Sequence, residues 1–216
     1  MSKKITKISN LKNLESFLQV NYLNGFKYID KAGEILNMYQ SKTGAIVYDM
    51  SPNRLIIPSP LANLDEIKIS NVDLWCHYIN PKNLGESERI FLEESEKLLK
   101  IIEVGKVTRI GWRNYYVYDL TKKPKNLNAL TTLSNASIRE LHFQKDLPND
   151  IKSSARIKLL KQKDDNKIVL FFDLDVYLDR EVGLTEGLQS FNKLRSAISS
   201  SEILDLINEI IQTIDK

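Results

Sequence analysis

The chain has 216 residues, of which 42% are hydrophobic and 27% charged, and its 31 basic and 28 acidic residues give a formal net charge of +3. These values are typical of a soluble globular protein and argue against a disordered, collagen-like or membrane-embedded chain. The single cysteine excludes an intramolecular disulfide and a thiolate zinc cage, and the two histidines exclude most histidine-rich metal sites.

The sequence lacks the common signals for membrane insertion and for catalysis. The N-terminus is basic without an apolar signal core, and no apolar run approaches the roughly 20 residues that a membrane span requires. There is no glycine-rich phosphate-binding motif, no G-x-S-x-G and no H-E-x-x-H. We therefore expect a cytoplasmic protein with no membrane association and no cofactor, and we assign no catalytic residue and no metal ligand.

The N-terminal part is expected to contain two helices and a hairpin. Apolar residues recur at helical spacing through residues 10–23, which predicts the first helix, and a second helix is expected over residues 26–40. A hairpin with a Ser-Pro-Asn turn is expected over residues 44–57, and prolines follow it. We therefore predict an N-terminal helix–helix–hairpin subdomain over residues 1–62 and an α+β sheet domain over residues 63–216.

The second domain is expected to begin with a strand, a helix and a long strand. β-Branched and aromatic residues predict a strand over residues 72–79. Asn83 and Glu86 have the spacing of a capping box, which predicts a helix over residues 85–103. A long strand is then expected over residues 107–120.

The chain continues through a polar excursion, residues 121–153, into further strands and C-terminal helices. Within the excursion we expect a short helix near residues 127–133 and a strand near residues 138–144. Two more strands are expected at residues 155–161 and 167–179, joined by an Asp-Asp-Asn turn. This order, with no visible internal repeat, predicts an α+β fold: a layered antiparallel or mixed sheet with helices on one face.

The last helix carries the strongest signal for a partner. Its wide apolar band consists of Ile203, Leu206, Ile207, Ile210, Ile211 and Ile214. We expect this band to pack on the sheet, and the alternative is an oligomer or adaptor interface.

Charged and aromatic residues of the two long strands share one predicted face, because side chains alternate along a strand. They are Arg109, Arg113, Tyr115, Asp173, Asp175 and Tyr177. The simplest interpretation is cross-strand ion pairs between the arginines and the aspartates. The face could also be an interaction surface for a charged partner. A third interpretation makes Asp173, Asp175 and Asp179 a divalent-metal site, because carboxylate oxygens suit Mg²⁺ or Ca²⁺.

A basic segment follows the long strand. Residues 121–163 contain ten basic and three acidic residues, a local balance of +7. Its candidate phosphate contacts are Lys122, Lys123, Lys125, Lys158 and Lys161. Only Phe143 is present there for stacking on bases, so the alternative is a solvated, lysine-rich loop.

Residues 107–118 read Val-Thr-Arg-Ile-Gly-Trp-Arg-Asn-Tyr-Tyr-Val-Tyr. This stretch resembles the R-[apolar]-G-x-R-[YN] strand motif of a sporadically distributed, uncharacterised family of prokaryotic proteins, and it departs from the family pattern at Trp112 and Tyr115. The resemblance extends over about residues 70–210. It implies a bacterial or archaeal origin and a role beside other gene products, in defence or mobile-element contexts, but it implies no activity.

The sequence leaves three hypotheses for the function. The first is a non-enzymatic interaction or adaptor protein within a larger prokaryotic assembly, with a protein partner or a homo-oligomer. The second is a nucleic-acid-associated protein that uses the basic segment 121–163. The third is a metal-dependent hydrolase centred on Asp173 and Asp175.

Overall fold

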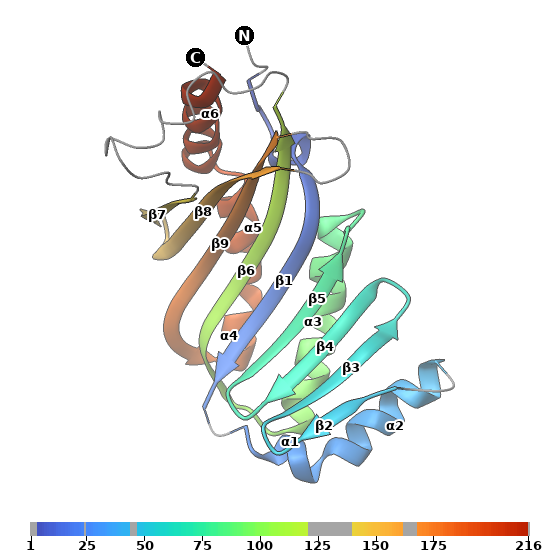
Figure 1. The fold of residues 1–216 in the computed structure, drawn as a ribbon. Helices are drawn as coiled ribbons and strands as arrows, with labels where there is room; N and C mark the ends of the chain where they lie inside the picture. Colours follow the sequence, from blue (N-terminus) through green and yellow to red (C-terminus); the bar gives the residue numbers. More distant parts are fainter. Residues whose placement is uncertain (1–3, 24, 44–46, 121–139, 162–167, 216) are drawn as a thin grey trace.

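A computed structural model describes residues 4–23, 25–43, 47–120, 140–161 and 168–215. Within these ranges, nine strands form one antiparallel sheet, and helices pack against one of its faces (Figure 1). This architecture confirms the predicted α+β class.

The first half of the chain begins with a short 3-10 helix (Ile8–Asn10) and ends with a long helix. Its other elements are β1 (Lys12–Tyr22), α1 (Lys27–Asp30), α2 (Ala32–Thr43), β2 (Asp49–Ser51), β3 (Arg54–Leu61), β4 (Leu64–Ser70), β5 (Asp73–Ile79) and α3 (Leu84–Ile101).

The second half begins with a long strand and ends with helices. Its elements are β6 (Lys106–Asp119), β7 (Glu140–Leu147), β8 (Ile151–Lys161), β9 (Ile168–Gly183), α4 (Leu184–Gln189), α5 (Phe191–Ile198) and α6 (Ser201–Asp215).

The sheet order β2-β3-β4-β5-β1-β6-β9-β8-β7 contains a repeat that the sequence does not display. In each half a long strand pairs with the last strand of the meander that follows it, β1 with β5 and β6 with β9. The two long strands then pair antiparallel with each other, with Leu18 opposite Trp112. Leu18 also pairs with Cys76, and Trp112 pairs with Val176. The two halves therefore have the same strand arrangement on either side of the β1–β6 pair, as under an approximate twofold axis.

The prediction of a helix over residues 10–23 is wrong, because this segment forms the central strand β1. Its buried positions Ser16, Leu18, Val20 and Tyr22 alternate as in a strand. Backbone pairing with β5 on one side and β6 on the other overrides the helical spacing of its leucines. The predicted second helix is confirmed as α1 and α2.

The expected domain boundary after residue 62 lies in the turn of the β3–β4 hairpin, where Leu61 pairs with Leu64. Strand β1 lies between β5 and β6, so the N-terminal part and the C-terminal part contribute strands to the same sheet. The strand predictions at 72–79 and 107–120 correspond to β5 and β6.

The remaining predicted elements have mixed outcomes. Strands β7, β8 and β9 confirm the three later strand predictions, and β8 and β9 are longer than expected. The short helix near residues 127–133 and the Asp-Asp-Asn turn lie outside the described residues. Helix α3 begins at the predicted cap, where Asn83 Oδ1 accepts hydrogen bonds from the backbone N–H groups of Gly85 (3.0 Å) and Glu86 (3.3 Å).

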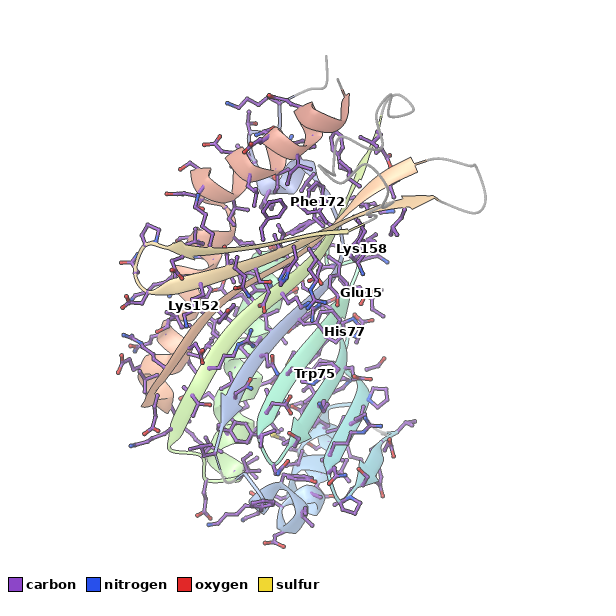
Figure 2. All side chains as sticks on the ribbon, turned by 60° about the vertical axis from the view of Figure 1, so that its left-hand side comes forward. Glu15, Trp75, His77, Lys152, Lys158 and Phe172 are labelled. Atoms are coloured by element: carbon purple, nitrogen blue, oxygen red, sulfur yellow. The ribbon has the colours of Figure 1, made fainter. Side chains whose placement is uncertain are left out.

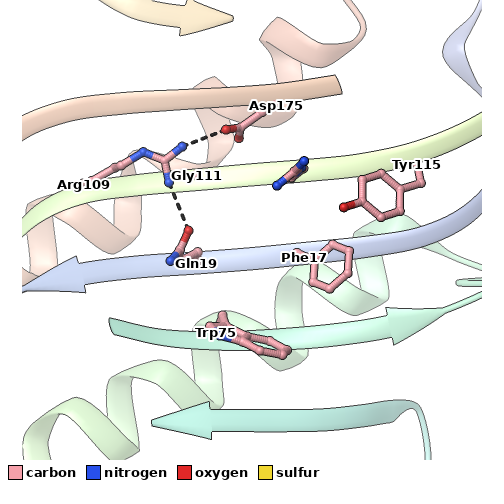
Figure 3. A pocket seen from close by; sticks show the side chains of 8 residues that line it. Phe17, Gln19, Trp75, Arg109, Gly111, Tyr115 and Asp175 are labelled. Carbon is pink, nitrogen blue, oxygen red and sulfur yellow. Dashed lines mark hydrogen bonds and ion pairs between the residues drawn. The ribbon is translucent and has the colours of Figure 1, made fainter. Parts of the chain in front are cut away.

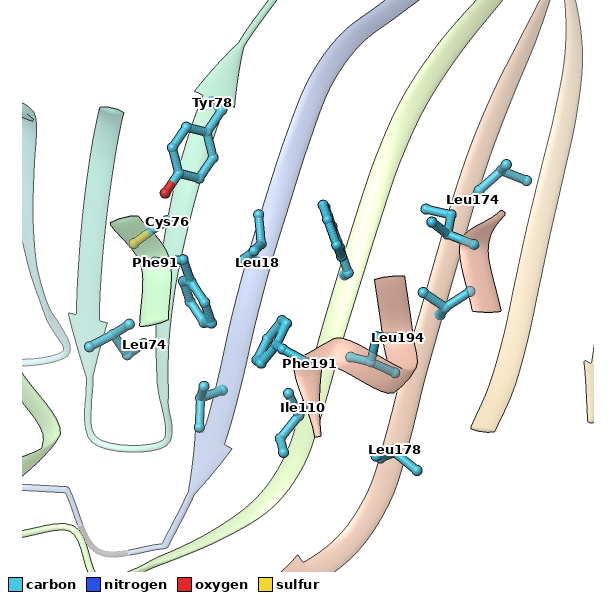
Figure 4. Close-up of a cluster of buried hydrophobic side chains, with 14 of the residues drawn as sticks. Leu18, Leu74, Cys76, Tyr78, Phe91, Ile110, Leu174, Leu178, Phe191 and Leu194 are labelled. Carbon is cyan, nitrogen blue, oxygen red and sulfur yellow. The ribbon is translucent and has the colours of Figure 1, made fainter. Parts of the chain in front are cut away.

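The core lies between the sheet and helices α2–α6. Leu18, Cys76, Trp112 and Val176 form one cross-strand row on the covered face, and all four are almost fully buried (Figure 4). Phe91 of α3 and Phe191 of α5 pack on this layer with ring centroids 4.7 Å apart. The apolar band of α6 packs inward, as expected, with Ile203, Ile207, Ile210 and Ile211 buried.

No helix in the described part of the chain is long and apolar enough to cross a membrane.

Candidate functional site

The sheet face opposite to α2–α6, here termed the open face, carries the candidate site (Figure 2). A hollow of about 250 Å³ lies near the middle of this face, on strands β1, β5, β6 and β9 (Figure 3). Buried Gly111 lies among the residues around it, and we call it the Gly111 hollow. Its other lining residues are Phe17, Gln19, Trp75, Arg109, Arg113, Tyr115 and Asp175.

Two arginine–aspartate pairs join β6 to β9 beside the hollow. Arg113 donates from Nε to Asp173 Oδ1 (2.7 Å) and from Nη2 to Asp173 Oδ2 (2.6 Å). Arg109 donates from Nη2 to Asp175 Oδ2 (2.8 Å) and from Nη1 to Gln19 Oε1 (3.0 Å). These are the ion pairs expected from the strand alternation. Bidentate geometry makes the Arg113–Asp173 pair the stronger of the two.

The Arg109 pair belongs to a polar chain that crosses the sheet. Gln19 Nε2 donates to Asp73 Oδ2 (3.1 Å), and Lys68 Nζ lies 3.6 Å from the same carboxylate oxygen. The Arg109 guanidinium also lies over the ring of Tyr177, 4.5 Å from its centroid. Because each charged group in this chain faces an opposite charge, Arg109 is held in one orientation on the sheet.

Half-buried aromatic rings form a contiguous row beside the ion pairs. Phe17 stacks on His77 with ring centroids 4.2 Å apart, and it contacts Trp75 (5.9 Å) and Tyr115 (5.3 Å) edge to face. The row continues from Tyr115 to Phe171 of β9, again at 5.3 Å. It therefore presents apolar ring surface on a face that water reaches.

Burial and the neighbouring charges act on the titratable groups of the site. Burial raises the pKa of Asp175 and outweighs the opposing effect of the Arg109 and Arg113 charges. The hydrogen bond to Asp173 raises the pKa of the Arg113 guanidinium above its ordinary value. Arg113 consequently remains charged at every accessible pH.

Gly111 lets the Arg109 guanidinium lie flat on the sheet. A Cβ atom at position 111 would lie 3.0 Å from Arg109 Nη1 and 3.3 Å from Arg109 Cζ. The space that a side chain would occupy at this position is therefore already taken by the arginine head group.

Gly111→Ala is expected to displace the Arg109 guanidinium and weaken its bonds to Gln19 and Asp175. The Arg109–Asp175 pair is partly hydrated, so the free energy of unfolding should fall by only about 1 kcal/mol or less. The measurement is the side-chain NMR signal of Arg109 Nε–H, together with chemical denaturation. An Arg109 signal that does not shift would contradict this account of Gly111.

The structure brings together all six residues that the sequence placed on one face. Tyr115 and Arg113 line the hollow, while Asp173 and Tyr177 each contact an arginine that lines it. Asp179 is in register with Arg109 on the neighbouring strand, but it pairs with Lys152 at 3.7 Å and does not line the hollow. Asp173 and Asp175 accept hydrogen bonds from arginines, and the described residues contain no cluster of three His, Cys, Asp or Glu able to hold a metal ion.

Sequence reasoning missed Phe17, Gln19 and Trp75. The first two lie on β1, which was predicted to be a helix. Trp75 precedes Cys76 in a correctly predicted strand. Cysteine is among the residues most often buried, and Cys76 is buried, so strand alternation places Trp75 on the opposite face. Trp112 is fully buried in the core, whereas Trp75 is half-buried on the open face.

Little of the basic segment falls within the described residues. Lys122, Lys123 and Lys125 lie outside them. Lys158 and Lys161 lie on β8, and Lys158 pairs in register with Phe171 at the end of the aromatic row. Figure 2 shows Lys152 and Lys158 at separate positions along this strand.

The cysteine and the histidines do not form a catalytic group. Burial raises the pKa of the Cys76 thiol, which lies on the covered face. His77 lies on the open face, 3.0 Å from Glu15 Oε2. His142 lies 3.0 Å from the Ser154 hydroxyl.

Compared with protein-family models, curated proteins and solved structures, the chain matches none of them. The function must therefore be inferred from the geometry of the open face.

Proposed function

We propose that the protein is a non-enzymatic interaction protein that docks a protein partner on its open face, within a larger assembly. The observation that carries this proposal is the Gly111 hollow: a concave site on an uncovered sheet face, surrounded by half-buried aromatic and arginine side chains. Aromatic residues and arginine are enriched at protein interfaces and dominate their binding energy.

The balance of charge on the open face supports a protein partner. Arg109, Arg113 and Lys152 each pair with an aspartate of β9. A surface that tracks a phosphate backbone instead requires a surplus of positive charge. The arrangement therefore suits a partner with mixed polar and apolar chemistry better than a polyanion.

A nucleic-acid partner is the second candidate, and the position of the aromatic row favours it. Phe171 of β9, which contacts Tyr115, lies beside β8, and β8 carries Lys152, Arg156 and Lys158. The sequence alone placed only Phe143 near these basic residues, and the fold adds rings on which bases could stack.

Purification of the tagged full chain from its own host at low salt tests the proposal. We expect a stoichiometric protein partner, identified by mass spectrometry, whose recovery falls at least about tenfold in the Trp75→Ala/Tyr115→Ala variant. Arg180→Ala is the matched control, because Arg180 forms an exposed ion pair with Glu186 away from the hollow.

The same samples separate the two candidates. Equal recovery of the partner by the Trp75→Ala/Tyr115→Ala variant and by the wild type would contradict the proposed docking face. Nucleic acid recovered without a protein partner, and released as the salt concentration rises, would replace the proposal with the second candidate.

A further inference from the structure

We propose that the Gly111 hollow receives a tyrosine side chain of the protein partner, with the phenol hydroxyl held between Arg113 and Asp175. This inference rests on the proposed function and names the chemistry of the group that occupies the docking face. It follows from the size of the hollow, its charge, its unused hydrogen-bonding atoms and its aromatic rings.

The size of the hollow fits one side chain. Its volume of about 250 Å³ lies below the roughly 300–1,000 Å³ of sites that enclose a small-molecule ligand. It also lies on the face of the sheet that the helices leave uncovered (Figure 1), so an occupant can enter while it remains attached to a larger partner. An anchoring side chain from a docked protein meets both conditions.

The charge of the hollow selects a neutral group. Arg109 is balanced by Asp175, and Arg113 is balanced by Asp173. A lysine or arginine anchor would meet two guanidinium groups, and a carboxylate anchor would meet Asp175. Either charged anchor would therefore bring one repulsive contact with each attractive one.

The unused hydrogen-bonding atoms require an anchor that both donates and accepts. Arg113 uses Nε and Nη2 on Asp173, and in the part of the chain that the structure describes no hydrogen bond uses its Nη1. Asp175 likewise accepts from Arg109 at Oδ2, with no bond at Oδ1 among the described residues. The two residues are direct cross-strand neighbours. One hydroxyl can therefore accept from Arg113 and donate to Asp175.

The aromatic rings distinguish tyrosine from the other neutral anchors. Phe17, Trp75 and Tyr115 offer ring surface to a flat apolar group. Phenylalanine would fill that space, but it would shield Arg113 Nη1 and Asp175 Oδ1 from water without forming hydrogen bonds to them. That loss of hydration would weaken binding. Tryptophan only donates, and histidine gains a proton near neutral pH and upsets the charge balance. Tyrosine alone combines the ring with a hydroxyl that donates and accepts.

Binding of capped pentapeptides Gly-Gly-X-Gly-Gly, with X as tyrosine, phenylalanine, lysine or glutamate, tests the inference. Each peptide is titrated into the full chain while the indole N–H signal of Trp75 is followed by NMR. We expect the tyrosine peptide to shift this signal and to bind at least about tenfold more tightly than the phenylalanine peptide. Equal binding of these two peptides, or a preference for lysine or glutamate, would overturn the inference.

A neutral double variant, Arg113→Met/Asp173→Asn, removes the guanidinium donor without leaving a buried carboxylate unpaired. It should abolish the preference for tyrosine over phenylalanine, whereas Arg180→Gln should retain it; a preference that survives in the double variant would overturn the inference. If the double variant loses the host partner while no peptide preference exists, the tyrosine inference fails and the docking face stands. If partner recovery is also unchanged, the proposed function fails with it.

Discussion

Trp112→Ala is expected to lower the free energy of unfolding by about 3–5 kcal/mol, because it empties the largest buried site of the core. Trp112 is fully buried on the covered face of β6, between two residues that face the other way, Gly111 and Arg113. The loss combines the apolar transfer energy of the indole with the cavity that remains. Urea denaturation followed by circular dichroism measures it.

Trp75→Ala is the matched control for this prediction. Trp75 is half-buried on the open face, where it contacts Phe17 and lies 5.4 Å from Lys68 Nζ, measured to the ring centroid. Its removal should cost only about 1 kcal/mol, since water already reaches the site. Similar losses for the two variants would contradict the division of the sheet into a covered face and an open face.

Glu94→Gln is expected to lower the free energy of unfolding by about 2 kcal/mol at neutral pH, because it neutralises a buried carboxylate that joins α3 to α2. Glu94 accepts hydrogen bonds from Tyr39 (2.8 Å), Lys42 (3.3 Å) and Lys97 (2.9 Å), and its side chain is 4% exposed. Burial raises the pKa of Glu94, but the hydrogen bonds from Lys97 and Tyr39 and the charge of Lys42 outweigh it and give a net lowering.

The pH dependence of this stabilisation follows from the lowered pKa of Glu94. A carboxyl group with a lowered pKa in the folded state contributes stability above its ordinary pKa, and the contribution is lost as the pH falls through the folded-state pKa. The difference between Glu94→Gln and the wild type should therefore be full at neutral pH and should shrink below the ordinary glutamate pKa of 4.5. Chemical denaturation at a series of pH values measures this difference.

Glu88→Gln provides the opposite case on the same helix. Burial raises the pKa of Glu88 and exceeds the lowering effect of Arg195, so the ionised form is disfavoured in the folded state. This substitution should increase the free energy of unfolding at neutral pH. A loss of stability in Glu88→Gln comparable to that in Glu94→Gln would show that the pKa directions do not control these two sites.

The arginine–aspartate pairs of the site could be predicted from the sequence, because β6 and β9 are long and their apolar and charged residues alternate clearly. Arg109 and Arg113 share a face by spacing alone, as do Asp173 and Asp175, and pairing of the two strands is enough to join them. The aromatic row could not be predicted, because its assembly depends on which strands are neighbours in the sheet. Phe17 and Trp75 meet because β1 lies between β5 and β6, and only tertiary pairing determines that order.

The error at β1 has a specific physical origin. Leu11, Leu14, Leu18 and Tyr22 have helical spacing, yet Leu18 and Tyr22 also belong to the alternating set with Ser16 and Val20. When a segment fits both the helical and the strand period, its tertiary contacts determine which conformation it adopts. Here hydrogen bonds from two flanking strands stabilise the extended form.

The approximate twofold arrangement of strands about the β1–β6 pair gives this single chain the layout of a fused homodimer. In a true symmetric dimer, each residue of a cleft on the axis would occur twice, so aromatic and ionic groups could not be separated. Within one chain the two sides of the Gly111 hollow differ. Phe17, Gln19 and Trp75 line it from β1 and β5, and Arg109, Arg113 and Asp175 line it from β6 and β9. The two sides consequently offer different contacts to an occupant.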